Sequence, residues 1–271
     1  MQGGTWGRQK PPVGSQINWE HPMSRGLIGC FLLNENAGVL ARNLVNNTFG
    51  TLTNMFSSTS GWCPGSPYSN GSSLRFDGSD RYVSCGASLG SVGNIQFAVS
   101  CRFYTTSPNT TQMLVTRDVD TSREWRLTIG DGSSGKIVFI YGSGTVIGAV
   151  SLVANTWYHV FAWYDSSAAT INVSVNGAPP TSASYALGTT AGAADFRIGG
   201  RAYPSFHNPL LGVIENAFVW TGRNGTLLLP NAYSSPYAMI QPPPATKFYS
   251  YAATVSTGNR RRRILCAGSI A

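Results

Sequence analysis

Short stretches in which apolar and polar residues alternate recur between residues 27 and 230. In SLRFDG, Leu74 and Phe76 share one face, and the turn residues Asp77 and Gly78 follow. Alternation with a period of two predicts half-buried strands. The same pattern appears in RYVSCG, IQFAVSCRFY, EWRLTIG, KIVFIYG, FRIGGR and LLGVIENAFVW, and no long 3.6-residue periodicity accompanies it. Many short strands at hairpin spacing predict an all-β fold, an antiparallel two-sheet sandwich or jelly roll.

Residues 155–179, NTWYHVFAWYDSSAATINVSVNGAP, place aromatic side chains on alternate positions of one predicted strand and end at an Asn-Gly hairpin turn. Such a row could be a ligand platform, a catalytic face or the inside of a sandwich. We expect the row to be chiefly core, and His159 to be a buried, hydrogen-bonded imidazole rather than a general base. The row comprises Trp157, His159, Phe161 and Trp163, and the opposite face carries Tyr158, Val160 and Tyr164.

Composition narrows the class of protein. Of 271 residues, 11% are charged and 31 are glycine, a profile typical of a turn-rich β protein. No apolar run is long enough to span a membrane, and the N-terminus has no apolar stretch typical of a secretory signal, so we expect synthesis in a cytoplasm.

An odd number of widely spaced cysteines predicts free core thiols rather than disulfides or a zinc site. They are Cys30, Cys63, Cys85, Cys101 and Cys266.

Three segments are predicted. Residues 1–26, rich in Gly and Pro, are expected to form an extended N-terminal arm, residues 27–230 the sandwich, and residues 231–271 an extended basic C-terminal arm.

The C-terminal segment from 241 onward carries five cations and no acid, and the net charge of the whole chain is +8. A run of arginines can contact phosphates, remain solvated or bind an acidic protein surface, and we expect nucleic acid not to be the partner. The five cations of the segment from 241 onward are Lys247, Arg260, Arg261, Arg262 and Arg263.

The order of motifs resembles the laminin-G-like, concanavalin A-like jelly-roll family. That family has a Phe-Asp-Gly strand, a Trp-x-His-Val strand ending in Tyr-Asp, a Val-Asn-Gly hairpin, an Ile-Gly-Gly strand and a Gly-x-Ile-Asp-Glu strand. Here the corresponding stretches are SLRFDG, TWYHVFAWYD, SVNGAP, FRIGG and LLGVIENAFVW, within residues 27–222. In addition, HPMSRGLIGCFLLNENAG looks like the opening segment of such domains in tailed-phage proteins.

The resemblance raises the question of glycosidase activity, since some relatives are glycosidases. A glycosidase needs two carboxylates about 5–10 Å apart across the scissile bond. The nearest candidate, DVDTSRE, contains Asp118, Asp120 and Glu124, and we interpret it as a solvated loop between strands. No Gly-x-Ser-x-Gly elbow, His-Glu-x-x-His motif or phosphate-binding glycine loop is present in the sequence. We therefore expect a protein that is not an enzyme.

Many laminin-G-like domains bind Ca²⁺ at the rim of the sandwich through carboxylate and carbonyl oxygens. Where the family commonly has Asp after the first strand, this chain has Asn43, and near the last strand Glu215-Asn216 stands where Asp-Glu is common. Each exchange removes a charge from the ligand set. We expect no cofactor, and Asp77 and Glu215 are the best candidates should calcium bind.

Two functions remain open. The first is a non-enzymatic virion structural protein, a capsid decoration or cement protein of a tailed phage. Its arms would bind the major capsid protein and further copies of itself, for example in a trimer. The alternative is a lectin-like module that attaches to host surface glycans. GRAYPSFHNP would supply the glycan or subunit contacts through Arg201, Tyr203, Phe206, His207 and Asn208, unless its aromatic residues pack onto the sandwich.

Overall fold

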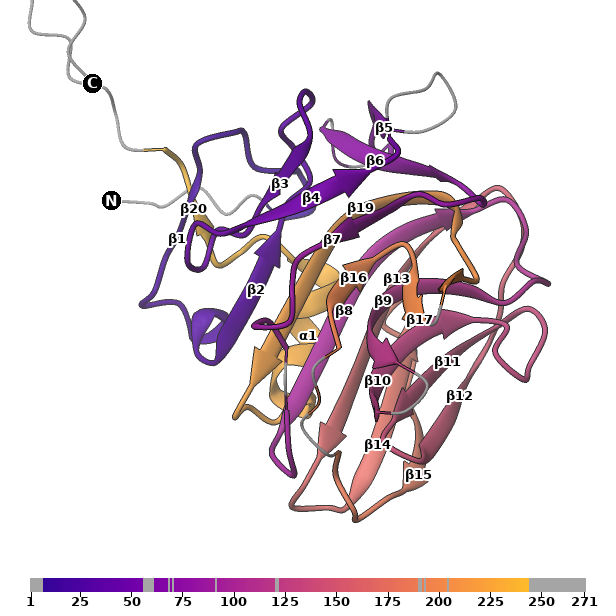
Figure 1. The fold of residues 1–271 in the computed structure, drawn as a ribbon. Coiled ribbons are helices and arrows are strands. Elements are labelled where there is room, and N and C mark those ends of the chain that lie inside the picture. Colours follow the sequence, from indigo (N-terminus) through magenta and orange to yellow (C-terminus); the bar gives the residue numbers. More distant parts are fainter. Residues whose placement is uncertain are drawn as a thin grey trace, which may run out of the picture.

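Two eight-stranded antiparallel sheets pack face to face in the computed structural model (Figure 1). The structure describes residues 7–55, 61–67, 69, 71–90, 92–119, 122–189, 192, 194–203 and 205–243. The predicted antiparallel sandwich is confirmed. Within the described residues, no helix has the length and apolar character needed to cross a membrane.

The first sheet, here called the β9 sheet, has the strand order β12-β11-β10-β9-β16-β7-β4-β3. Its central hairpin surrounds the predicted turn at Asp131-Gly132, and register shifts occur within the β9–β10 pair. The strands are β3 (Leu40–Arg42), β4 (Phe49–Thr53), β7 (Tyr82–Ser84), β9 (Gln112–Val119), β10 (Ser122–Ile129), β11 (Lys136–Tyr141), β12 (Gly144–Ser151) and β16 (Phe196–Ile198).

The second sheet, here called the β13 sheet, has the order β15-β14-β13-β8-β19-β6-β5, and β2 also pairs with β19. The Asn176-Gly177 turn joins β14 to the segment before β15, and both turn residues have positive φ, as such a hairpin requires. The strands are β2 (Leu27–Phe31), β5 (Gly61–Pro64), β6 (Ser72–Asp77), β8 (Phe97–Thr105), β13 (Thr156–Asp165), β14 (Thr170–Val175), β15 (Thr181–Ser184) and β19 (Leu211–Thr221).

The remaining elements are short. A two-stranded pair joins β1 (Gln16–Ile17) to β20 (Ile240–Gln241), and β17 (Arg201–Tyr203) pairs with β18 (Ser205–His207). A 3-10 turn, η1, spans Pro22–Ser24, and one α-helix, α1, spans Gly225–Ser234. The side chain of Asn224 caps α1 by accepting a hydrogen bond from the backbone N of Thr226 at 2.9 Å.

The main core lies between the sheets and is rich in aromatic side chains. Phe97 on β8 packs against Trp125 on β10, with ring centroids 4.7 Å apart, and Tyr141 stacks on Tyr164 at 4.5 Å. Cys101 is fully buried here as a free thiol, as predicted, and burial raises its pKa. The set Tyr158, Val160 and Tyr164 points into this core.

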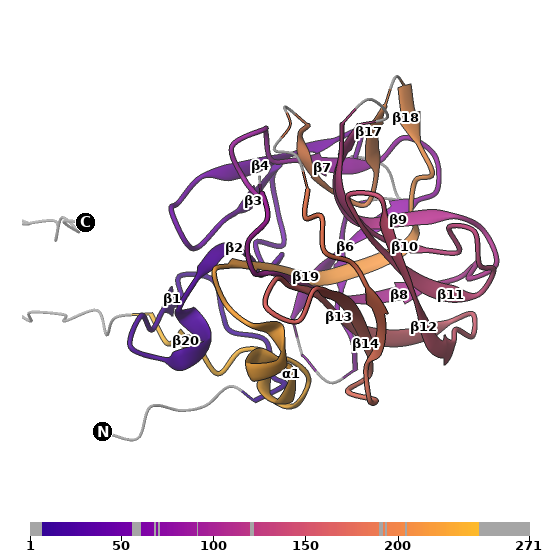
Figure 2. The same ribbon diagram turned by 90° about the horizontal axis from the view of Figure 1, so that it is seen from below.

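The opposite row of β13 faces away from the main core. Phe161 and Trp163 belong to a second hydrophobic cluster on the outer side of the β13 sheet. The helix α1 and the β1–β20 pair lie on this side of the sandwich (Figure 2) and contribute side chains to the cluster. Leu228 and Ala232 of α1 supply the covering side chains. The row is therefore only partly core: His159 is 5% exposed, while Trp157 is half-buried at an open end of the sheet.

The described parts of the two predicted arms pack on the sandwich of their own chain. Ile17, only 5% exposed, pairs with Ile240 across the β1–β20 ladder. Lys10 is buried, and its Nζ donates to the carbonyl of Leu33 at 3.0 Å and of Glu215 at 2.6 Å. The predicted boundary at 230 falls inside α1. Residues 8–26 and 231–243 thus contribute to the second hydrophobic cluster and do not extend away from it.

We predict that Ile17→Ala lowers the free energy of unfolding by about 2–3 kcal/mol, because it removes buried apolar surface from the second cluster. Urea unfolding followed by tryptophan fluorescence measures this change. Val13→Ala, at a side chain that is 61% exposed in the same segment, is the control and should have little effect. Equal effects of the two substitutions would contradict the packing described.

The interpretation of DVDTSRE as a solvated loop is wrong for Asp118 and Glu124. Both carboxylates lie on the β9–β10 hairpin and are at most 1% exposed. Arg126 Nη1 lies 2.6 Å from Asp118 Oδ2, and Arg117 Nε lies 2.9 Å from Glu124 Oε2. Asp120 lies outside the described residues. Arginines on neighbouring positions compensate the buried charges, which the spacing of the acids alone did not reveal.

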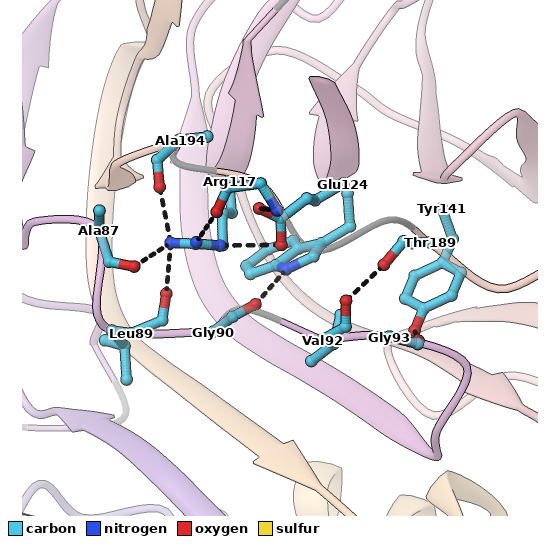
Figure 3. Close-up of polar contacts among 12 residues, drawn as sticks. Ala87, Leu89, Gly90, Val92, Gly93, Arg117, Glu124, Tyr141, Thr189 and Ala194 are labelled. Carbon is cyan, nitrogen blue, oxygen red and sulfur yellow. Dashed lines mark hydrogen bonds and ion pairs between the residues drawn. The ribbon is translucent and has the colours of Figure 1, made fainter.

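Arg117 and Glu124 form the centre of a buried network, here called the arginine clamp (Figure 3). Arg117 Nη1 donates to the carbonyls of Ala87 and Ala194 at 2.6 Å each and of Leu89 at 3.2 Å. Its Nη2 donates to the carbonyl of Gly192 at 2.6 Å, and Glu124 Oε1 accepts from the Gly192 N at 2.7 Å. The clamp joins the loop before β8 to the loop before β16 at one end of the sandwich.

Candidate functional site

The outer face of the β13 sheet is covered at one end and open at the other. The second hydrophobic cluster covers the end near Phe161 and Trp163. At the other end, four residues from four neighbouring strands lie side by side in register. Trp157 of β13 is opposite Tyr104 of β8, Tyr104 is opposite Val213 of β19, and Val213 is opposite Arg75 of β6.

This open end forms a cleft of about 760 Å³, here called the sheet cleft. Its volume is within the range of ligand-binding clefts in proteins. The strands form its floor, and the segment after β5 forms one wall. The lining residues are Pro64, Gly65, Arg75, Phe76, Asp77, Ser79, Tyr104, Thr106, Trp157, Leu211, Gly212 and Val213.

An aromatic platform forms one side of the sheet cleft. The rings of Trp157 and Tyr104 are half-buried, with centroids 5.6 Å apart. The hydroxyl of Tyr104 donates to Asn155 Oδ1 at 3.0 Å, which fixes the direction of the ring. Half-buried aromatic faces that remain open to solvent can contact the apolar face of a ligand without a large loss of conformational entropy.

Gly212 brings β19 close to β8 beneath this platform. A Cβ atom at residue 212 would lie 2.0 Å from the carbonyl O of Tyr104. The backbone contact therefore excludes any side chain at this position.

Polar groups line the other side of the sheet cleft. Arg75 is exposed, and Asp77 is half-buried at the end of β6. Asp77 Oδ2 lies 3.1 Å from Arg81 Nε, and Asp77 Oδ1 accepts from the Ser79 N at 3.1 Å. The guanidinium of Arg75 supplies donors and the carboxylate of Asp77 supplies acceptors, the two functions needed to bind hydroxyl groups.

Between the open and covered ends, the outer face carries a row of buried polar groups. Arg102 Nε lies 3.2 Å from Glu215 Oε2, and Ser66 Oγ lies 3.3 Å from Glu215 Oε1. A register shift of β19 places both Glu215 and Asn216 beside Arg102. Asn216 Oδ1 accepts from the Arg102 N at 3.1 Å, and its Nδ2 donates to the hydroxyl of Tyr237 at 2.7 Å.

The two calcium candidates, Asp77 and Glu215, do not share a site. Asp77 is opposite Leu211 on β19, four residues before Glu215, which corresponds to about 13 Å along a strand. Glu215 is fully buried and paired with Arg102. Asn43 supports local structure, since its Oδ1 accepts from the Cys30 N at 2.9 Å. Among the described residues, no three His, Cys, Asp or Glu side chains are grouped closely enough to hold a metal ion.

The loop candidates lie near the β9 sheet and outside the sheet cleft. Arg201 is buried, with its Nε 3.1 Å from Asp118 Oδ2, so it contributes to the buried ion pairs. The carbonyl of Asn208 accepts from the Met113 N at 2.9 Å. The backbones of Tyr203, Phe206 and His207 form the β17–β18 hairpin, but their side chains lie outside the described part of the structure. Arg260, Arg261, Arg262 and Arg263 also lie outside it.

The sequence pattern did not single out Tyr104 and Arg75, and it placed Trp157 chiefly in the core. One signal for Tyr104 was present: in FAVSCRFY the apolar face carries Phe97, Val99 and Phe103, so Tyr104 points to the other side. The sequence did not show that Trp157 and Arg75 lie in the same row. That row depends on how four strands, distant in sequence, align in register.

The family comparison agrees with the arrangement of the strands. Residues 77–223 match the model of the concanavalin A-like lectin/glucanases superfamily. The chain belongs to this superfamily. No curated protein sequence shows significant similarity to it.

Solved structures of this fold resemble the chain at low sequence identity. Trypanosoma rangeli sialidase in complex with sialic acid is 15% identical with a TM-score of 0.57, over 78% of this chain and 33% of the sialidase. Domain 4 of AbnA, a GH43 extracellular arabinanase from Geobacillus stearothermophilus in complex with arabinotriose, is 17% identical with a TM-score of 0.55. That match covers 75% of this chain and 97% of the domain. The chain thus spans about a third of the sialidase but nearly all of the arabinanase domain.

A third similar structure is the binding domain of Paraclostridial Mosquitocidal Protein 1. It is 13% identical with a TM-score of 0.56, over 78% of this chain and 53% of that domain. The prediction of a capsid decoration protein is contradicted by these comparisons, because the similar structures are a sialidase, an arabinanase domain and a toxin binding domain. The alternative prediction, carbohydrate binding, is not contradicted. The oligomeric state and the location stay predictions.

Proposed function

We propose that this concanavalin A-like protein binds carbohydrate in the sheet cleft. The observation that carries the proposal is the row of Trp157, Tyr104 and Arg75 across the open end of the β13 sheet, with Asp77 beside it. A sugar ring presents an apolar face that packs on aromatic rings. Its hydroxyl groups take hydrogen bonds from the guanidinium and donate to the carboxylate.

The composition of the sheet cleft favours binding over hydrolysis. Asp77 is the one carboxylate among the described residues that line it. Glycosidases commonly need a second carboxylate about 5–10 Å away, as general acid or nucleophile. We therefore propose a non-catalytic role, in which the protein holds a glycan without cleaving it.

We predict that Trp157→Ala lowers glycan affinity about 30-fold, the loss typical of removing a central aromatic contact. An array of immobilised oligosaccharides, with arabinotriose among them, identifies a ligand for the wild-type protein. Titration calorimetry with that oligosaccharide then compares the variants. Trp157→Phe, which keeps an aromatic face, should retain most of the affinity.

Trp19→Ala is the matched control, because the Trp19 side chain is 54% exposed and does not line the sheet cleft. It should leave binding unchanged. If no oligosaccharide binds the wild-type protein, or if Trp157→Ala and Trp19→Ala bind equally well, the proposal fails. Thermal unfolding of both variants confirms that each is folded.

A further inference from the structure

A second, smaller cavity of about 140 Å³ lies beside the sheet cleft, and Trp157 lines both. We call it the side pocket. Five segments meet there: the N-terminal segment, β8, β13, the turn after β14 and the region around α1. Its lining residues are Arg8, Arg102, Trp157, Tyr158, His159, Asn176, Tyr233 and Pro236.

The side pocket is lined by two arginines. The guanidinium of Arg8 lies over the ring of Tyr233, 4.5 Å from its centroid. Arg102 also lines the pocket, and the buried carboxylate of Glu215 compensates its charge. The described lining residues include no carboxylate, so the charge of Arg8 makes the pocket net positive. Arginine is suited to bind planar or tetrahedral oxyanions through paired N–H donors.

His159 supplies an independent observation that points to a ligand. Its side chain is 5% exposed, and its Nε2 is buried without a hydrogen-bond partner. The backbone N of His159 donates to Asn176 Oδ1 at 2.9 Å, and the imidazole ring packs on Tyr233, with ring centroids 5.8 Å apart. A buried polar atom without a partner is costly, and an acceptor in the pocket would satisfy an Nε2–H donor.

The electrostatics support an anion rather than a cation in the side pocket. Burial, together with the charges of Arg102 and Arg8, lowers the pKa of His159 to about 3. The imidazole is therefore neutral near pH 7 and can donate one hydrogen bond. The volume of about 140 Å³ corresponds to four or five water molecules, enough for a carboxylate or a sulfate group.

We propose that the side pocket binds the oxyanion of an acidic sugar residue, a carboxylate or a sulfate, whose ring lies on Trp157 in the sheet cleft. This inference rests on the proposed carbohydrate binding, and it adds the class of ligand. The anion contacts Arg8, Arg102 and His159 Nε2–H, while the neighbouring sugar residues contact Tyr104 and Arg75. A neutral glycan fills the sheet cleft alone.

The test uses the full chain with three probes in calorimetry: an oligogalacturonate, its carboxyl-reduced neutral counterpart, and a heparin-derived sulfated oligosaccharide. We expect at least one acidic probe to bind about 10-fold more tightly than the neutral one, as expected for a buried charge-assisted contact. Arg8→Ala should reduce this ratio to about one. Arg25→Ala removes the same charge at an exposed position outside the pocket and should leave the ratio unchanged.

A second readout is the titration of the His159 imidazole by NMR, assigned with His159→Asn. Adding the preferred acidic probe should raise the pKa of His159, because a bound anion stabilises the imidazolium. Titration with inorganic sulfate distinguishes a free-anion site: if sulfate raises this pKa and neither acidic glycan binds better than the neutral one, the inference is overturned.

The outcomes separate the two proposals. Neutral and acidic probes that bind equally well, with affinity dependent on Trp157, would overturn the side pocket and leave carbohydrate binding in place. Binding of acidic probes that Arg25→Ala weakens as much as Arg8→Ala would show general charge attraction and would also overturn the inference. Absence of binding to every probe and every array glycan would remove both.

Discussion

Arg117→Met is expected to lower the free energy of unfolding by about 3–5 kcal/mol, the cost of leaving one partner of a buried ion pair uncompensated. Arg117 is 1% exposed, and Glu124, at 2.9 Å from its Nε, is fully buried. The methionine fills most of the volume but cannot donate. The carboxylate of Glu124 and the carbonyls of Ala87, Gly192 and Ala194 then lose the donors that Arg117 supplies.

A double variant tests whether Arg117 acts as one half of an ion pair or as a clamp for two loops. In Arg117→Met/Glu124→Leu neither charge of this pair remains, so a simple pair would recover stability. We expect no recovery, because the carbonyls of the two loops stay without donors in both variants. Urea unfolding at neutral pH measures the three proteins. Full recovery in the double variant would show that the loop carbonyls contribute little.

Acid is expected to destabilise the protein through His159. Its folded-state pKa of about 3 lies below the ordinary value of 6.5, so the unfolded chain binds the proton more tightly. The stability from the neutral imidazole is complete above pH 6.5 and is lost as the pH falls toward 3. The full slope of about 1.4 kcal/mol per pH unit is reached only below pH 6.5, where the unfolded imidazole is half protonated, so the loss between pH 6.5 and 4.5 is about 2 kcal/mol.

The groups around His159 explain the direction of this shift. Burial is the largest cause, and the positive charges of Arg102 on β8 and Arg8 in the N-terminal segment add to it. The carboxylate of Glu215, 3.2 Å from Arg102, offsets part of the positive charge of Arg102. The ring of Tyr233, on α1, packs against the imidazole with centroids 5.8 Å apart.

Unfolding curves at pH 6.5 and 4.5 for wild type and His159→Gln isolate this contribution, since carboxylates titrate in both proteins. The variant should lose about 2 kcal/mol less than wild type over this interval. His21→Gln is the control: His21 is only half-buried, so its lowered pKa contributes less. An equal pH dependence in wild type and His159→Gln would rule out a buried neutral imidazole.

The strands and their turns could be predicted because period-two alternation is a local property. Leu74 and Phe76, Asp131-Gly132 and Asn176-Gly177 all lie where the pattern placed them. The helix α1 was missed. Its sequence GTLLLPNAYS contains Pro230 and lacks a helical period, and α1 packs against the second cluster through Leu228 and Ala232. Its tertiary contacts outweighed a weak local propensity.

The candidate site was predictable only in part. Asp77 was named as a calcium candidate, and it lines the sheet cleft. Glu215 was named by analogy with a calcium site, but the structure pairs it with Arg102 in the buried row. The loop containing Arg201 and Asn208 lies elsewhere, and Asp118 proved to be a buried partner of Arg126 and Arg201.

The sequence by itself determined the class of fold, because alternation and turn residues act over a few positions and require strands with one buried face. Only the tertiary structure decided which residues line the outer face of the β13 sheet and which end of that face is open. The register of β13, β8, β19 and β6 aligns Trp157, Tyr104 and Arg75, and the chain ends and α1 cover one end of that face while leaving the other open. Contacts between strands far apart in sequence set both features, and a local pattern carries no information about them.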